Sequence, residues 1–177
     1  MTKSGQKRFD NLIQLVNARG VKILADKKQK YLEKLGNDCS VIRDQKKYSR
    51  NDLKIFLALL YWGEGNKTDK NLSFTNSDHQ MVSVYLWLLR AAFDVKKEKM
   101  FAWLHLHDYY SRPEMISFWS KITGIDKRRI NVYNKKNTAI RKKDGYRGCI
   151  LVRYGNYVIF DELMIIINRF FKFTEKL

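Results

Sequence analysis

The feature that most constrains this chain is an apolar run over residues 53–62 that ends in Gly-Glu-Gly at residues 63–65. Residues 49–52 supply a capping side chain and an acidic residue, which is typical of the start of a helix. A helix with so few polar positions must be packed on several sides. Glu64 then lies at the negative end of a buried helix, where a lone carboxylate is unfavourable without a nearby cation. A bound metal ion would meet that requirement.

The charge balance indicates a polyanionic partner. The 177 residues include 35 Lys and Arg against 18 Asp and Glu, which gives a net charge of +17. Such an excess destabilises the compact state by self-repulsion, so nucleic acid is the simplest partner. A cationic surface kept for solubility is the alternative.

Cysteine usage and hydropathy favour an intracellular protein. Cys39 and Cys149 are too few for a disulfide framework or a cysteine-rich zinc site, and they fit a reducing compartment. The sequence contains no recognisable signal peptide or membrane span. We therefore expect a cytoplasmic protein, or an organellar one if it is encoded in an intron, with no membrane partner.

Residues 1–50 are expected to form a basic helical extension. Apolar residues recur at helical spacing before Gly20 and again before Gly36, and both glycines are natural helix ends. Two short helices joined at Gly20 favour a helix-turn-helix, but the lysine-rich stretch of the second fits a solvated helix face equally well. Residues 36–50 are polar and rich in turn formers, so we expect a connection to a second domain over residues 51–177.

The second domain is expected to have an α+β fold, with helices covering one face of a four-stranded sheet. Alternation of apolar and polar residues predicts strands, and helical spacing with capping residues predicts the helices between them. The expected strands are residues 71–77, 99–107, 130–135 and 148–154, and the helices after residue 64 are 78–93, 113–122 and 158–173. A mixed or antiparallel sheet can leave its other face exposed.

The exposed face of this sheet is the predicted nucleic-acid surface, because donors, acceptors and cations suited to base edges and phosphates alternate onto it. These residues are Ser73, Thr75, Ser77, His105, His107, Asn131, Tyr133, Lys135 and Arg153. The loop beside the sheet adds the cations Lys136, Arg141, Lys142, Lys143 and Arg147. A plain solvated sheet face is the alternative, but the cation cluster favours phosphate contact.

Residues 57–65, which read LALLYWGEG, resemble the motif that gives the LAGLIDADG homing endonucleases their name. The residues identical to the motif are Leu57, Ala58, Leu60 and Gly65. Gly63 is small where the family has a small residue, and Glu64 occupies the position of the metal-binding acid. Leu59 replaces the first glycine of the motif, and Trp62 replaces its first acid.

The resemblance implies a site-specific endonuclease that makes double-strand breaks in a long, nearly palindromic DNA site. The family core has the order αββαββα, and here it would cover roughly residues 51–173 with an extra helix after the first strand. A single-motif protein of the family pairs its motif helix with that of a second copy, which brings two carboxylates together over adjacent phosphates. The residues expected at this interface are Leu57, Ala58, Leu60 and Tyr61.

The resemblance also implies a divalent cation, Mg²⁺ or in its place Mn²⁺ or Ca²⁺, held by Glu64 and Gly63 of each copy. Phosphodiester cleavage needs an activated water and stabilised oxygens, tasks that suit Mg²⁺ ions bound by carboxylates and phosphates. The family also uses basic residues that order water around the metals, and the catalytic candidates for that role are Lys135, Lys136 and Arg153.

Other interpretations of the same residues stay open. The scaffold can bind nucleic acid without cutting it, as a maturase that binds intron RNA or as a DNA-binding regulator. Glu64 can also simply end a helix and pair with a nearby lysine. His105 and His107 lie two residues apart on one strand face, so they fit a zinc site, a water-ordering role or ordinary polar surface, with His79 the only other histidine.

Overall fold

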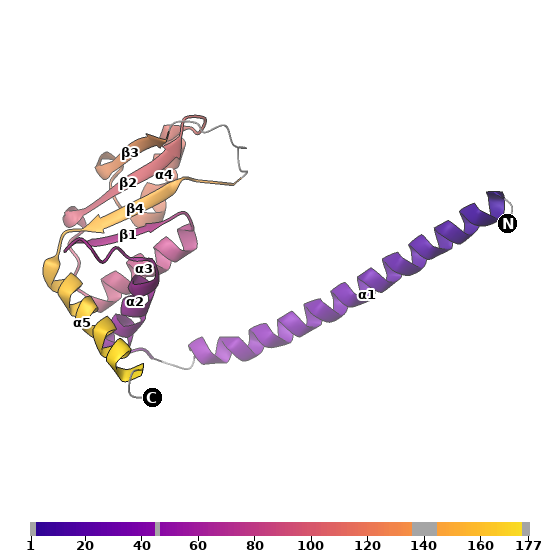
Figure 1. The fold of residues 1–177 in the computed structure, drawn as a ribbon, viewed down its shortest axis with the longest axis horizontal. Coiled ribbons are helices and arrows are strands. Elements are labelled where there is room, and N and C mark those ends of the chain that lie inside the picture. Colours follow the sequence, from indigo (N-terminus) through magenta and orange to yellow (C-terminus); the bar gives the residue numbers. More distant parts are fainter. Residues whose placement is uncertain (1–2, 45–46, 136–144, 175–177) are drawn as a thin grey trace. The chain divides into compact units, whose positions relative to one another are not determined.

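The computed structural model describes residues 3–44, 47–135 and 145–174, and these residues form five α-helices and a mixed four-stranded sheet (Figure 1). The expected α+β class is therefore confirmed. The chain divides into two compact units, Met1–Lys47 and Tyr48–Leu177, close to the expected domain boundary at residue 50.

The first unit is one continuous helix, α1 (Lys3–Asp44). The predicted break at Gly20 was wrong, and so was the predicted connection from residue 36, because α1 continues through both Gly20 and Gly36. A glycine inside a helix costs about 1 kcal/mol relative to alanine, which the helix-forming residues around it offset. Since residues 3–44 contain no turn, they do not form a helix-turn-helix.

The second unit begins with a helix whose start is fixed by a capping box, α2 (Arg50–Glu64). The Ser49 hydroxyl accepts a hydrogen bond from the backbone N–H of Asp52 at 3.2 Å. The Asp52 carboxylate in turn accepts one from the backbone N–H of Ser49 at 2.9 Å. This reciprocal pair satisfies two amide donors that the first turn of a helix leaves without partners.

Four strands form one sheet in the order β1-β4-β2-β3. They are β1 (Leu72–Asn76), β2 (Met100–His107), β3 (Ile130–Lys135) and β4 (Cys149–Tyr154), and each lies within its expected range. β4 is antiparallel to β1 and β2, whereas β2 and β3 are parallel, so β1, β2 and β3 all run in one direction. Figure 1 shows β1 and β3 at the two edges of this mixed sheet.

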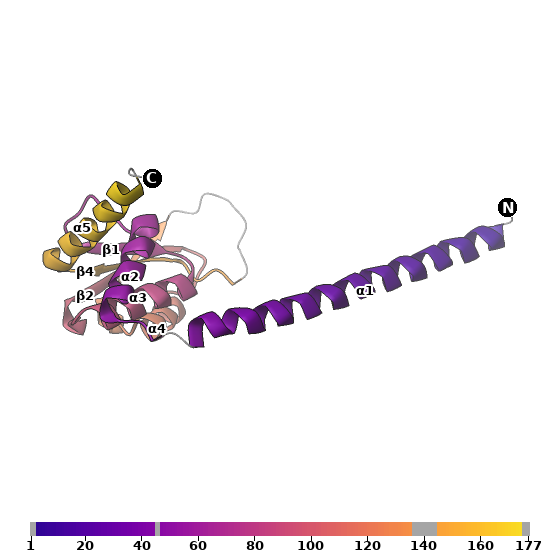
Figure 2. The same cartoon turned by 90° about the horizontal axis from the view of Figure 1, so that it is seen from below.

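Helices make the crossovers that parallel strands require. α3 (His79–Ala92) connects β1 to β2, and α4 (Arg112–Thr123) connects β2 to β3, both along one side of the strands (Figure 2). The short 3₁₀ turns η1 (Lys97–Lys99) and η2 (Lys127–Arg129) lead into β2 and β3. α5 (Tyr157–Thr174) follows β4 and packs on α2 and β1. This is the predicted order of elements.

The core lies between these helices and one face of the sheet. The fully buried strand residues that form its floor are Leu72, Phe74, Ala102, Leu104, Leu106 and Ile150. The ring of Phe74 stacks on that of Tyr85 of α3, with centroids 4.2 Å apart. Among the described residues, no helix combines the length and apolar character needed to cross a membrane.

Candidate nucleic-acid interface

The sheet face away from the helices carries most of the residues predicted to contact nucleic acid. Paired residues on neighbouring strands point to the same side, so the register assigns each face. The pairs on this face include Ser73 with Arg153, Thr75 with Leu151, Trp103 with Asn131, and His105 with Tyr133. The predicted alternation is confirmed for these strand residues, while their contact with nucleic acid stays a prediction.

Two aromatic residues on this face, Phe101 and Trp103, were not among the predicted ligands. The alternation of β2 already placed them beside His105 and His107, so the signal was present in the sequence. The guanidinium of Arg129 lies 5.0 Å from the Phe101 ring centroid. That of Arg153 lies 5.4 Å from the Trp103 ring centroid. The face therefore combines flat rings with cations.

Ser73 and Arg153 are held in a hydrogen-bonded group at one side of this face. Arg153 donates from Nε to the Ser73 hydroxyl at 3.1 Å and from Nη2 to the Asp69 carboxylate at 2.8 Å. Ser73 is only 1% exposed, so the prediction that it contacts nucleic acid was wrong. The charge of Arg153 is half-buried and paired with Asp69.

The parallel strands β1, β2 and β3 end at one edge of the sheet, here called the carboxyl edge. Ser77 follows β1 and is exposed, and His107 and Lys135 end β2 and β3 as a register pair. Arg153 lies elsewhere, because it pairs with Ser73 near the start of β1, roughly 10 Å along the strand. The sheet thus brings His107 and Lys135 to one edge and leaves Arg153 away from it.

The predicted basic loop falls mostly outside the described residues. The side chain of Lys135 and the whole of Lys136, Arg141, Lys142 and Lys143 lie there. Arg147 is described and exposed, and its guanidinium lies 5.5 Å from the ring centroid of Phe118 on α4. Its backbone carbonyl accepts a hydrogen bond from Nε1 of the buried Trp119 at 2.7 Å, which fixes the entry into β4.

Glu64 lies at the carboxyl edge, beside the last residue of β1. Its carboxylate is exposed and accepts a hydrogen bond from Nδ2 of Asn76 at 3.3 Å. Among the described residues no lysine pairs with Glu64, and its hydrogen-bond partner is the Asn76 amide instead. Within residues 3–44, 47–135 and 145–174, no group of three or more His, Cys, Asp or Glu side chains could hold a metal ion. Glu64 therefore does not belong to a three-ligand cluster within the described part of one chain.

Tyr61 fixes the chain on either side of Glu64. Its ring is fully buried below the end of α2, and its hydroxyl donates to the carbonyl of Asn66 and accepts from the N–H of Ser73. Gly65 forms a bridge with Phe74 of β1, so the segment after α2 lies along the sheet edge. Burial raises the pKa of Tyr61, which keeps its hydroxyl protonated and able to donate.

The side of α2 that is exposed is not the side predicted to form the dimer interface. Leu57, Ala58 and Tyr61 are fully buried in the core of their own chain, so the prediction that they contact a second copy was wrong. Leu60 is partly buried against the same core. The outward apolar residues are Phe56, Leu59 and Trp62, which are 40%, 43% and 42% exposed. Because α2 is apolar on almost every side, its sequence did not reveal which side faces inward.

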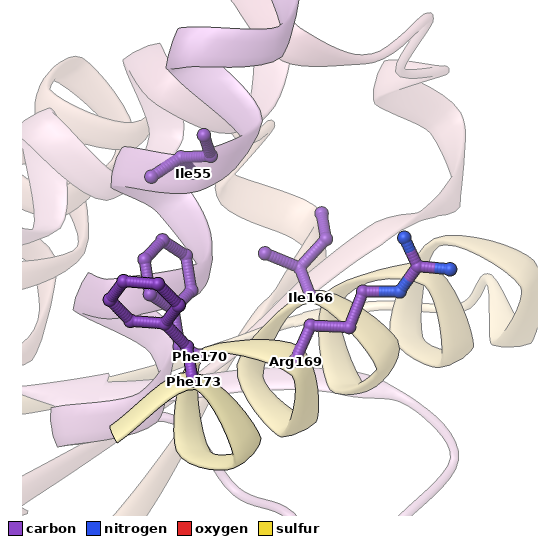
Figure 3. A pocket seen from close by; sticks show the side chains of 5 residues that line it. All are labelled: Ile55, Ile166, Arg169, Phe170 and Phe173. Carbon is purple, nitrogen blue, oxygen red and sulfur yellow. The ribbon is translucent and has the colours of Figure 1, made fainter. Parts of the chain in front are cut away.

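An apolar groove runs between the outward side of α2 and the last turns of α5 (Figure 3). Its volume is about 420 Å³, and its lining comes from Ile55 of α2 and from Ile166, Arg169, Phe170 and Phe173 of α5. Together with Phe56 and Leu59, it extends the exposed apolar surface beyond α2 alone.

His107 belongs to an aromatic cluster at the carboxyl edge. Its ring stacks on Tyr109 with centroids 5.4 Å apart, and Tyr109 contacts Tyr110, which contacts Tyr146. Burial raises the pKa of Tyr146, and neighbouring Cys149 and tyrosine groups add to the shift. His79 lies against Phe118 instead, so the third histidine of the suggested zinc site is engaged elsewhere.

Comparison of the chain with protein-family models, with curated proteins and with solved structures finds no match. The resemblance to LAGLIDADG endonucleases therefore depends on the motif residues themselves.

Proposed function

We propose that the chain is a nucleic-acid-binding protein that cuts double-stranded DNA as a homodimer, in the manner of the LAGLIDADG endonucleases it resembles. The observation that carries this proposal is the position of Glu64, which lies exposed at the end of an apolar helix and beside an open sheet face. The net charge of +17 favours a polyanion as the ligand of that face.

The motif residues fit a hard divalent cation such as Mg²⁺. A carboxylate is a preferred Mg²⁺ ligand, and the last carbonyls of a helix, including that of Gly63, lack intrahelical partners. Glu64 and Gly63 would hold the ion together with a scissile phosphate, and the ion would supply charge stabilisation at the phosphate. Because the described part of one chain holds no cluster of three ligand side chains, the resemblance implies that a second copy supplies the other carboxylate.

The outward apolar residues of α2 support pairing with a second copy. Exposed rings and aliphatic groups at Phe56, Leu59 and Trp62 form a stripe at helical spacing, which favours packing against another helix. The α2–α5 groove enlarges this apolar surface. We infer that the interface uses these outward residues in place of Leu57, Ala58 and Tyr61.

The test is cleavage of DNA that spans an intron-less insertion site of the gene, with Mg²⁺ or with a chelator. Glu64→Gln keeps the shape of the side chain but removes its charge, so we expect cleavage to be lost while DNA affinity stays within a few-fold. Glu98→Gln, exposed in the η1 turn that leads into the opposite end of β2, makes the same change away from the carboxyl edge and should cut normally. Undiminished cleavage by Glu64→Gln would remove Glu64 from the mechanism.

Binding without cleavage is the second candidate, either to intron RNA or to DNA as a regulator. The described residues bring no cluster of three ligand side chains to Glu64, which favours this candidate, because metal-assisted cleavage uses several ligands. A role as a DNA-binding regulator loses its main support, because α1 is one helix without the turn of a helix-turn-helix. Salt-sensitive binding without breaks in the cleavage assay would favour this candidate.

A further inference from the structure

Flat aromatic rings are exposed on the open face of the sheet, on two adjacent strands. Phe101 and Tyr133 are 42% and 61% exposed, and Trp103 is half-buried between them in the register. Trp103 pairs with Asn131 and His105 pairs with Tyr133, so Trp103 and Tyr133 are diagonal neighbours across β2 and β3. Diagonal side chains on neighbouring strands lie roughly 7–8 Å apart at their backbones, within reach of two aromatic rings.

A DNA duplex gives such rings nothing to stack on. In a duplex the faces of the bases are stacked on one another, and the grooves present only base edges and the sugar-phosphate backbone. Unpaired nucleotides differ, because their base faces are free to stack on aromatic side chains or on arginine planes. The exposed rings on this face therefore match the chemistry of unpaired bases.

We propose that the open face of the sheet binds single-stranded nucleic acid, with one base stacked on Trp103 and a neighbouring base on Tyr133. The proposal shares with the proposed function the premise that nucleic acid binds this face, but it assigns an unpaired strand to the face where the proposed function assigns a duplex. It requires neither Glu64 nor a second copy of the chain.

The surroundings of the two rings suit a nucleotide. Asn131 is exposed and lies level with Trp103, where its amide can meet the edge of a stacked base. Arg129 and Arg153 place guanidinium groups over the rings of Phe101 and Trp103. The Arg129 guanidinium can pair with phosphate, whereas that of Arg153, already paired with Asp69, can continue the stack as a flat cation.

Stacking is tested by comparing three labelled probes of equal length in fluorescence anisotropy: a single strand of thymidines, the same backbone without bases, and a duplex. The stripped backbone has the charge of the strand but no base faces. We expect the full-length protein to bind the thymidine strand at least tenfold more tightly than the stripped backbone. Equal affinity for these two probes would overturn the proposal.

Tyr133→Ala should weaken binding of the thymidine strand about tenfold, the usual effect of losing one stacked base, and leave the stripped backbone unaffected. Tyr133→Phe retains the ring and should bind like the wild type. Tyr157→Ala removes a tyrosine of similar exposure on α5 and serves as the matched control. If Tyr133→Ala binds the thymidine strand like the wild type, the assignment of Tyr133 is wrong.

The two proposals fail separately. Glu64→Gln should bind the thymidine strand normally, because it leaves the rings of the sheet face unchanged. Tyr133→Ala, in turn, leaves Glu64 unchanged. A wild-type preference for the duplex over the thymidine strand would show that the face serves as a groove-binding surface and would overturn single-strand binding.

Discussion

Two glycines on either side of Glu64 should respond in opposite ways to the same substitution. Gly65 follows α2 with φ −81° and ψ 155°, a conformation open to any residue, so its requirement for glycine is steric. A Cβ atom there would lie 2.6 Å from Cγ of Tyr61, and closer still to Cδ2 and Cε2. Gly63 is inside α2, and a Cβ on it would have nothing within 4 Å.

The Tyr61 ring cannot move aside, because it is fully buried with Tyr85 and Phe160 each 6.4 Å away between ring centroids. Overpacking of this kind costs about 1–3 kcal/mol, and three close ring atoms favour the upper end. Replacing glycine returns about 0.4–1 kcal/mol through the unfolded chain. Gly65→Ala should therefore lower the free energy of unfolding by about 2 kcal/mol, whereas Gly63→Ala should raise it by about 0.5–1 kcal/mol.

A double-mutant cycle isolates the steric cause. Tyr61→Leu removes the ring, so Gly65→Ala in that background should cost less than about 0.5 kcal/mol. Urea unfolding followed by tryptophan fluorescence measures the change, because all four tryptophans lie in the second unit. The reasoning is refuted if Gly65→Ala costs as much without the ring as with it, or if the two glycine variants shift the unfolding midpoint in the same direction.

Two further predictions concern the core and α1. Tyr85 is buried with no hydrogen-bond partner for its hydroxyl among the described residues, so Tyr85→Phe should stabilise the protein by about 1–2 kcal/mol in urea unfolding at pH 7. Burial raises the pKa of Tyr85 above its value in the unfolded chain. The stability of the wild type relative to Tyr85→Phe should therefore fall by about 1.4 kcal/mol per pH unit above about pH 10. A stability difference between the two proteins that does not change with pH would show that the hydroxyl ionises in the folded state. Gly20→Ala should increase hydrogen-exchange protection in α1 by about 1 kcal/mol, because a Cβ there meets nothing within 4 Å, and reduced protection would contradict an open position.

The strands were predictable because their signal is local. In β2, the buried Met100, Ala102 and Leu104 alternate with Trp103 and His105, a pattern of period two that needs no knowledge of the neighbouring strands. The strand order was not predictable in this way. β4 lies between β1 and β2, and that placement depends on pairings between residues far apart in the chain, such as Phe74 with Val152.

The N-terminal helix shows where local signals mislead. Gly20 and Gly36 are common helix ends, but a glycine ends a helix only when the chain turns there, and a cost of about 1 kcal/mol is small against a long run of helix formers. The sequence of α1 has no packed apolar face that would mark how far the helix extends, so it did not indicate that α1 continues to Asp44.

The orientation of α2 decides what the departures from the motif mean. Leu57, Ala58 and Tyr61 face the core, so Leu59 and Trp62, which replace the first glycine and the first acid of the motif, face outward. Part of each side chain, 43% of Leu59 and 42% of Trp62, is therefore open to a second chain. If two copies pair through this side, the axes of the two helices are separated by the side chains between them, commonly by about 8–10 Å. Leu59 and Trp62 would then set the distance between the two Glu64 carboxylates, and with it the phosphates that the pair can reach.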